Sequence, residues 1–322
     1  MSAGALARVR LACLPTPLHP APGLSAALRT EVWLKRDDLT GLGLGGNKVR
    51  ALEFLLAEAE AAGADCLVTG GGAQSNWAAL AALAARRSGL DPVLVAYGPP
   101  RPVTGNLVLA ALAGAEVHFT GDPDRASVDR GVQELTAKLL AAGRRPYSVP
   151  RGGATGVGAL GYLAAAAELA AQLQAAGVVA AELWLATGSC GTQAGLVAGW
   201  RAHALPGRVV GVSVSRPVDE CLDRVARLAA EAAELAGHDL GKGGPGDDAD
   251  VVVLGGHLGP GYGIASPAGE RAARLVARSE GVLLDPVFGA KAMGALVAAC
   301  PRPGPVAFLV SGGAPTLFAA PA

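Results

Sequence analysis

The sequence predicts an α/β protein in which mostly parallel sheets carry helices on both faces. Short β-rich runs alternate with alanine- and leucine-rich helical runs along almost the whole chain, and this alternation favours parallel sheets. The chain has 322 residues, of which 51% are hydrophobic and 17% are charged. A chain of this length and composition is globular, can bury a large core and is expected to divide into two domains.

The expected strands are short runs of apolar and β-branched residues. They are Val32–Lys35, Cys66–Gly70, Pro92–Ala96, Glu116–Thr120, Glu182–Thr187, Val209–Val214, Val251–Leu254 and Val306–Ser311. Helical patterns lie between them, for example at Lys48–Ala61, Asn76–Arg87, Ala126–Ala142, Gly158–Ala176 and Ala268–Ser279. In the first of these, apolar positions such as Val49, Leu52 and Leu56 follow helical spacing. Gly237–Asp248, rich in glycine and aspartate, is expected to be an exposed loop.

Charge and cysteine content exclude several classes of protein. Lysine and arginine together number 27, as do aspartate and glutamate, so no basic excess favours nucleic acid or an anionic membrane as a partner. The five cysteines contain no C-x-x-C pair, which is typical of a reducing compartment. The five histidines show no metal-ligand spacing, and the N-terminus lacks a long apolar segment. We therefore expect a soluble cytoplasmic protein that binds no metal.

The stretch GLGLGGNKVR, Gly41–Arg50, allows three interpretations. Three of its glycines have the spacing of a dinucleotide-binding loop, but RDDLTG separates the preceding strand from the rest of the glycine run and the second strand supplies no ribose-binding acid. A P-loop needs lysine directly after its second glycine and then a hydroxyl residue, and this chain has neither. In the third interpretation the glycines clear space and Lys48 carries the chemistry.

Lys48 is either an ordinary solvated lysine or a reactive amine. It stands at the expected start of a helix, where the helix dipole disfavours a cation. The same position would lower the pKa of the amine and favour its neutral, nucleophilic form. The local sequence leaves both accounts open.

Two further segments have the design of an anion-binding turn. TGGGAQSNWAALAAL, Thr69–Leu83, and LATGSCGTQAGLVAG, Leu185–Gly199, each run from a strand end through a glycine-rich turn into a helix. Free backbone N–H groups and the helix dipole make such a turn a ready phosphate site. Glycine turns also join strands to helices in any α/β fold, but two of them together with a poised lysine suggest a phosphorylated cofactor and an anionic substrate.

Seven motifs, in order and spacing, resemble the D-cysteine desulfhydrase / 1-aminocyclopropane-1-carboxylate deaminase family. They are KRDDLTGLGLGGNKVRALEFLL, TGGGAQSNWAA, VPRGGATGVGALGY, ATGSCGTQAGL, VSVSRP, LLDPVFGAKAMGAL and SGGAPTLFA. The family uses pyridoxal 5'-phosphate and has the tryptophan-synthase-β fold, fold type II. The resemblance implies two domains, each an open, twisted, mostly parallel sheet flanked by helices. Residues 53–160 would form the smaller domain and residues 1–52 and 161–322 the larger, cofactor-binding one, in a homodimer.

The resemblance also implies roles for individual residues. Lys48 matches the lysine that binds the cofactor as an imine, and Asn76 matches the residue that bonds the ring hydroxyl of the cofactor. Ser75 stands where the family binds the substrate carboxylate or assists proton transfer, although it could also cap its helix. Tyr262 matches an active-site tyrosine or packs its loop, and Ser311 matches a hydroxyl residue that faces the pyridine nitrogen. The phosphate loop corresponds to Gly188, Ser189, Cys190, Gly191 and Thr192.

Three positions depart from the family pattern. Phe288 follows DPV where tyrosine is common, Gly289 stands where threonine or glutamate is usual, and Trp77 follows QSN where histidine or glutamine is common. Phe288 and Trp77 are expected to line the substrate pocket together with Ser75 and Asn76. Because phenylalanine cannot exchange a proton, we expect little opening of a cyclopropane ring.

The function that these residues and the resemblance imply is that of a lyase or deaminase of a small amino acid. Its expected reaction is α,β-elimination from D-cysteine or another β-substituted alanine, which gives a keto acid and ammonia. One alternative is a specialised enzyme of the same fold that carries out β-replacement or another biosynthetic reaction. The other is a cofactor-binding protein with little catalysis of its own.

Overall fold

The expected strands and helices form with small changes at their ends. The structure, a computed structural model, describes residues 6–238 and 251–319, so most of the expected loop at 237–248 lies outside the described residues. The strands are β1 (Leu18–Pro20), β2 (Val32–Arg36), β3 (Cys66–Gly71), β4 (Asp91–Ala96), β5 (Glu116–Phe119), β6 (Pro146–Ser148), β7 (Glu182–Thr187), β8 (Arg208–Ser213), β9 (Val251–Leu254) and β10 (Val306–Val310). Two of these, β1 and β6, were not expected, because three residues are too few to show an alternating pattern.

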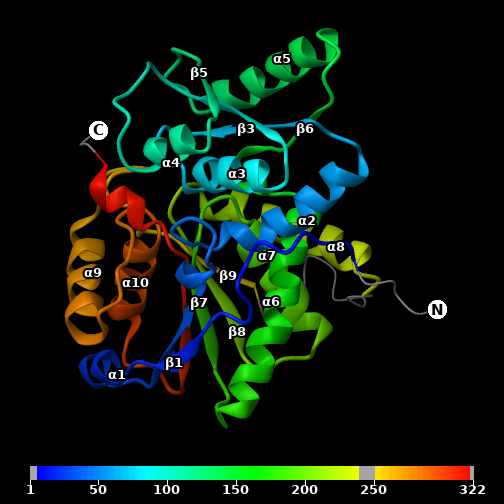
Figure 1. Ribbon diagram of the computed structural model, residues 1–322. Coiled ribbons are helices and arrows are strands. Elements are labelled where there is room, and N and C mark those ends of the chain that lie inside the picture. Colours follow the sequence, from blue (N-terminus) through cyan, green and yellow to red (C-terminus); the bar gives the residue numbers. More distant parts are fainter. Residues whose placement is uncertain (1–5, 239–250, 320–322) are drawn as a thin grey trace.

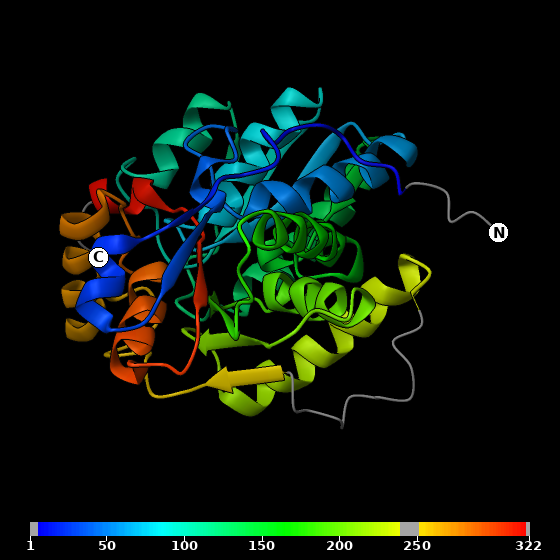
Figure 2. The same cartoon turned by 90° about the horizontal axis from the view of Figure 1, so that it is seen from below.

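The larger sheet has six strands in the order β1-β2-β10-β7-β8-β9, and only β1 runs antiparallel to its neighbour. One of its faces is covered by α1 (Pro22–Leu28), α9 (Pro267–Glu280) and α10 (Gly289–Ala299). The other face is covered by α6 (Gly156–Ala175), α7 (Gly191–Ala202) and α8 (Val218–Leu235). Figure 2 shows this sheet between the two helix layers.

The smaller sheet has four parallel strands in the order β5-β4-β3-β6 and lies above the larger one in Figure 1. The helix α5 (Ser127–Ala141) covers one face, and α3 (Asn76–Arg87) with α4 (Asn106–Leu112) covers the other. The α/β class with parallel, helix-flanked sheets is confirmed. The expected domain boundaries fall inside α2 (Lys48–Ala61) and α6, two helices that pack on each other, and they stay a prediction.

Helix α6 is long and apolar enough to cross a membrane, the one such helix among the described residues. Its sequence contains little charge because most of its surface faces protein: 61% of its most apolar window is buried. Close packing accounts for its glycines, since a Cβ at Gly161 would lie 2.3 Å from the backbone oxygen of Arg50. Its apolar character is therefore that of a core helix.

A buried cluster of charges fixes the start of α2. The guanidinium of Arg50 donates to Asp37 at 2.7 Å and to Glu168 at 2.8 Å. Lys35 also pairs with Glu168, and the hydroxyl of Tyr162 donates to Asp37. Because these partners belong to β2, to the 3₁₀ turn Asp37–Leu39 and to α6, the cluster anchors the first turn of α2 to three other segments.

Candidate active site

A cavity lies between the two sheets, at the carboxyl ends of their strands. Its empty volume is about 940 Å³, including the part that is open to solvent. The carboxyl ends of parallel strands are where open α/β sheets bind ligands. The cavity is lined by eleven of the twelve predicted site residues: Lys48, Ser75, Asn76, Trp77, Gly188, Ser189, Cys190, Thr192, Tyr262, Phe288 and Ser311. Gly191 is predicted too but is not among the lining residues.

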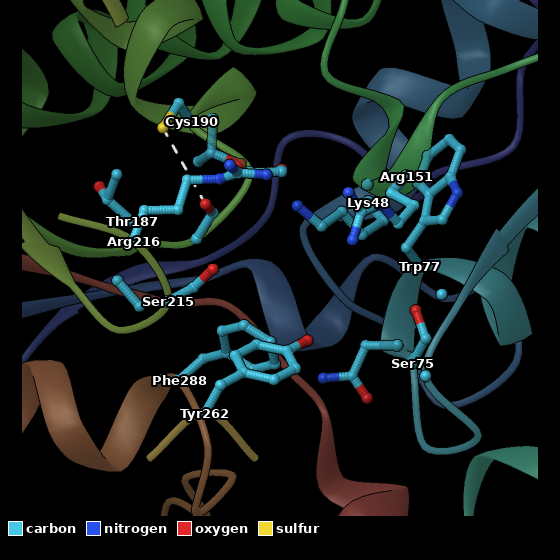
Figure 3. A pocket seen from close by; sticks show the side chains of 18 of the residues that line it. Lys48, Ser75, Trp77, Arg151, Thr187, Cys190, Ser215, Arg216, Tyr262 and Phe288 are labelled. Carbon is cyan, nitrogen blue, oxygen red and sulfur yellow. Dashed lines mark hydrogen bonds between the residues drawn. The ribbon is translucent and has the colours of Figure 1, made fainter. Parts of the chain in front are cut away.

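Figure 3 shows how residues from the two sheets face each other across this cavity. Ser75 and Trp77 lie on one side, and Thr187, Cys190 and Arg216 lie on the other. The first two follow β3 of the smaller sheet, whereas the others end or follow β7 and β8 of the larger sheet. The cavity is thus formed jointly by both sheets.

Lys48 reaches the cavity because a glycine-rich loop folds tightly before α2. A Cβ at Gly45 would lie 1.9 Å from the backbone oxygen of Asp38, and the φ of Gly45 is +71°. The backbone N–H of Asn47 donates to the oxygen of Ser311 at 2.9 Å, which brings Lys48 beside the end of β10. A 3₁₀ turn separates β2 from these glycines, so they do not form the strand-turn-helix unit of a dinucleotide site.

The amine of Lys48 is shifted toward its neutral form. Burial lowers its pKa from 10.5 to about 8. The sequence also predicted a lowered pKa, but from the dipole at the helix start. In the structure the pKa is lowered mainly because burial in the cavity desolvates the amine. A lysine of this kind is suited to nucleophilic and general-base chemistry.

Ser75 and Asn76 stand at the start of α3. The hydroxyl of Ser75 accepts a hydrogen bond from the backbone N–H of Ala78 at 3.2 Å, so Ser75 caps the helix as well as lining the cavity. The side-chain nitrogen of Asn106 donates to the Asn76 oxygen at 2.6 Å. This bond holds the Asn76 carbonyl, and it leaves the Asn76 NH₂ group as the donor available to a ligand.

The segment between β7 and α7 has the features of an oxyanion cradle. Its residue Cys190 has a φ of +76° and precedes α7 without a side-chain cap, so the first N–H groups of the helix remain open. The hydroxyl of Ser189 is buried and has no hydrogen-bond partner among the described residues. The hydroxyl of Thr192 accepts from the side chain of Asn47 at 3.0 Å. Unpaired donors at a helix start fit a phosphate group.

Cys190 and Gly191 support this turn in different ways. The Cys190 thiol, labelled in Figure 3, lies 4.0 Å from the backbone oxygen of Gly188, and the nearby Cys221 thiol and burial raise its pKa. The thiol therefore adds no negative charge beside the open N–H groups. Gly191 begins α7, and a Cβ there would meet Ala154 at 3.4 Å, an ordinary contact. The positive φ that this turn requires falls on Cys190 instead.

Aromatic side chains form another part of the cavity wall. The rings of Tyr262 and Phe288 meet edge to face, with centroids 6.2 Å apart. Burial raises the pKa of Tyr262, so its hydroxyl stays protonated. Trp77 is 3% exposed and donates from its indole nitrogen to the Thr69 hydroxyl at 2.8 Å. Trp77 is therefore held in place in the core while it lines the cavity.

Sequence reasoning missed the cationic and polar residues that complete the lining. They are Asn47, Tyr97, Arg125, Arg151, Thr187, Gln193, Ser215 and Arg216. Arg151 and Arg216 follow closely after β6 and β8, where a residue at a strand end could have been noticed. No aspartate or glutamate lines the cavity in the described part of the chain. The cavity is therefore cationic, as a site for anionic groups should be.

Comparison with known proteins places this chain in a family. The family model described as pyridoxal-phosphate dependent enzyme matches residues 9–312. A D-cysteine desulfhydrase of Salmonella choleraesuis (strain SC-B67) is 39% identical over 97% of this chain and 95% of its own length. The D-cysteine desulfhydrase of Salmonella newport (strain SL254) is 38% identical over the same shares.

Solved structures agree with this placement. The structure of an ACC deaminase homologue matches with a TM-score of 0.90 at 34% identity and covers 98% of this chain and 94% of its own. A fungal L-serine ammonia-lyase from Rhizomucor miehei, 18% identical with a TM-score of 0.65 over 95% of this chain and 94% of its own, shares the fold. The chain therefore belongs to the family of pyridoxal-phosphate-dependent enzymes, and pyridoxal 5'-phosphate is its cofactor, as the motifs implied.

Proposed function

We propose that this enzyme is a lyase that releases a keto acid and ammonia from a small β-substituted amino acid by α,β-elimination. D-Cysteine and related β-substituted alanines are the proposed substrates. The observation that carries the proposal is the Lys48 amine, whose pKa is lowered to about 8 by burial. The similarity to D-cysteine desulfhydrases over nearly the full chain supports the choice of reaction.

The cavity residues suit the proposed positions around the cofactor. The turn from Gly188 to Thr192 would hold the phosphate, because its open N–H groups and the unpaired Ser189 hydroxyl need an oxyanion partner. Asn76 would donate to the ring hydroxyl, and Ser311 would face the ring nitrogen. When bound, pyridoxal phosphate supplies the electron sink that stabilises negative charge at the substrate α-carbon.

The protein's part in the reaction is to move protons and orient the substrate. With a pKa of about 8, about one Lys48 amine in ten is neutral at pH 7 and able to take the α-proton. Ser75, at the start of α3, would bind the substrate carboxylate together with the adjacent backbone N–H groups. Tyr262 keeps its proton, so its hydroxyl can donate to the leaving group.

Phe288 argues against opening of a cyclopropane ring. Its ring contacts Tyr262 and adds no proton donor or acceptor to the cavity. Loss of one positioned acid–base group costs about 10²–10⁴ in rate. A substrate with a good β-leaving group needs Lys48 to take only the α-proton, and it should therefore react while the cyclopropane amino acid should not.

Keto acid release from a panel of D- and L-amino acids tests the function. The purified holoenzyme should release pyruvate from D-cysteine or β-chloroalanine, with sulfide as co-product from cysteine. Lys48→Ala should abolish turnover, whereas Lys138→Ala, at an exposed position on α5, should leave it unchanged. Absence of keto acid from every β-substituted alanine, or full activity in Lys48→Ala, would refute the proposal.

We also propose a cytoplasmic homodimer whose chain divides at residues 52/53 and 160/161. The resemblance to the family supports the dimer and the division of the chain, and five cysteines without a C-x-x-C pair support a reducing compartment. Light scattering coupled to gel filtration should give twice the chain mass of 31.9 kDa. A mass of one chain would contradict the dimer.

A further inference from the structure

We propose that Arg125 forms an anion-binding subsite in the cavity, so that the enzyme prefers amino acids whose β-substituent is itself anionic, such as a sulfate or phosphate ester. The inference rests on the proposed elimination reaction. It concerns a residue in the loop before α5, far in sequence from the motifs that identify the cofactor site.

Within the described part of the chain, Arg125 is the cavity arginine that no carboxylate pairs with. Arg151 is paired with Asp129 at 2.6 Å, and Arg216 is paired with Glu220. Arg125 has no carboxylate within ion-pair distance among residues 6–238 and 251–319. The nearby acids Asp122 and Asp129 are occupied by other arginines. A half-buried guanidinium with no counter-ion favours an incoming anion.

The guanidinium is nevertheless held in place. Its central carbon lies 3.7 Å from the centroid of the Tyr262 ring, which is a cation–π stack. Two of its nitrogens approach Ser215, at 3.4 and 3.5 Å, which is the outer limit of a hydrogen bond. An arginine has five N–H donors, so most remain available. Tyr262 and Ser215 thus orient the guanidinium and leave most of its N–H donors available to an oxyanion.

The other anions of the reaction already have partners. The cofactor phosphate is assigned to the start of α7, and the substrate carboxylate is assigned to Ser75 at the start of α3. Figure 3 shows Tyr262, which carries Arg125 on its face, apart from Lys48 and from Ser75 in the cavity. A third anionic group is therefore needed to match Arg125, and a β-substituent near the proposed donor Tyr262 provides it.

The test compares an anionic and a neutral leaving group on one amino acid skeleton. Keto acid release is measured with O-sulfoserine and O-acetylserine, both enantiomers, and the ratio of their kcat/KM values is taken for each holoenzyme. Arg125→Gln should lower this ratio about tenfold or more, because a charge-assisted hydrogen bond is lost. Arg125→Lys should retain part of the ratio. Arg227→Gln, which alters an exposed arginine on α8 that pairs with Glu231 outside the cavity, should leave it unchanged.

Two further readouts separate the possible roles of Arg125. Added salt should lower the wild-type ratio more than the Arg125→Gln ratio, because screening weakens an ionic contact. Calorimetric titration of the holo Lys48→Ala protein, which cannot turn the substrate over, should show that O-sulfoserine loses affinity with Arg125→Gln while O-acetylserine does not.

Distinct results would overturn the inference. An equal loss for both substrates would place the α-carboxylate at Arg125, and an unchanged ratio would show that no anion binds there. Absence of keto acid from both substrates would count against the elimination function alone. The titration would then still decide whether Arg125 binds the anionic group.

Discussion

Replacing Lys48 by methionine should stabilise the cofactor-free protein while removing its catalytic amine. Burial lowers the pKa of Lys48 from 10.5 to about 8, so the charged amine is disfavoured in the folded state. Each pKa unit corresponds to about 1.4 kcal/mol, which makes the penalty about 3.5 kcal/mol when the amine is charged in both states. Methionine fills a similar volume without a charge and should gain most of this amount at pH 7.

The stability gained by Lys48→Met should depend on pH. The folded-state pKa of Lys48 lies below the unfolded value, so the unfolded chain binds more protons between about pH 8 and pH 10.5. Wild-type stability from this group therefore rises with pH through that window. Below about pH 8 the full penalty applies, and above pH 10.5 it is gone. The advantage of Lys48→Met should shrink over the same window.

Urea unfolding of the two cofactor-free proteins at pH 7 and at pH 10.5 measures the effect. Because other groups titrate equally in both proteins, the difference between them isolates Lys48. The control Lys138→Met replaces an exposed lysine and should change the free energy of unfolding by less than about 0.5 kcal/mol. If Lys48→Met is no more stable than wild type at pH 7, or if its advantage is the same at both pH values, the amine is not desolvated.

Three other changes test neighbouring parts of the account. Thr192→Val should weaken cofactor retention by about 1–3 kcal/mol, measured as cofactor absorbance after dialysis; unchanged retention would place the phosphate elsewhere. Arg50→Met should leave Asp37 buried without its partner and cost about 3–5 kcal/mol, so a urea midpoint near that of wild type would contradict the anchoring cluster. Phe288→Tyr should raise any weak desulfhydrase activity, and no gain would exclude a proton-transfer role at this position. Gly289 is left unchanged in this variant, because a Cβ there would lie 3.2 Å from the buried carboxylate oxygen of Asp285 and would disturb the packing.

Sequence reasoning found the elements whose patterns are local. Helix α2 and strand β7 have the expected bounds because apolar spacing and flanking turns define them. The same reasoning missed β1, which is three residues long and is defined by its pairing with β2. This pairing depends on a second strand beyond helix α1, and three residues alone carry no pattern that predicts it.

Some residues of the candidate site could likewise be predicted from local sequence, and others could not. Lys48 and the turn before α7 could be found because glycines and helix starts mark them. Arg125 could not, because it stands in an irregular loop and meets its partner Tyr262 only through the tertiary fold. The cause of the lowered Lys48 pKa could not be predicted from the sequence either, because desolvation depends on which residues surround the amine in the folded protein.

Borohydride reduction of the holoenzyme followed by peptide mapping tests the central claim most directly. We predict that the pyridoxyl mass is found on the peptide that contains Lys48, which lines the cavity. The other buried lysines are engaged elsewhere: Lys35 pairs with Glu168, and Lys291 donates to two backbone oxygens at 2.7 and 2.9 Å. A pyridoxyl group on Lys35, on Lys291 or on any lysine other than Lys48 would contradict the account.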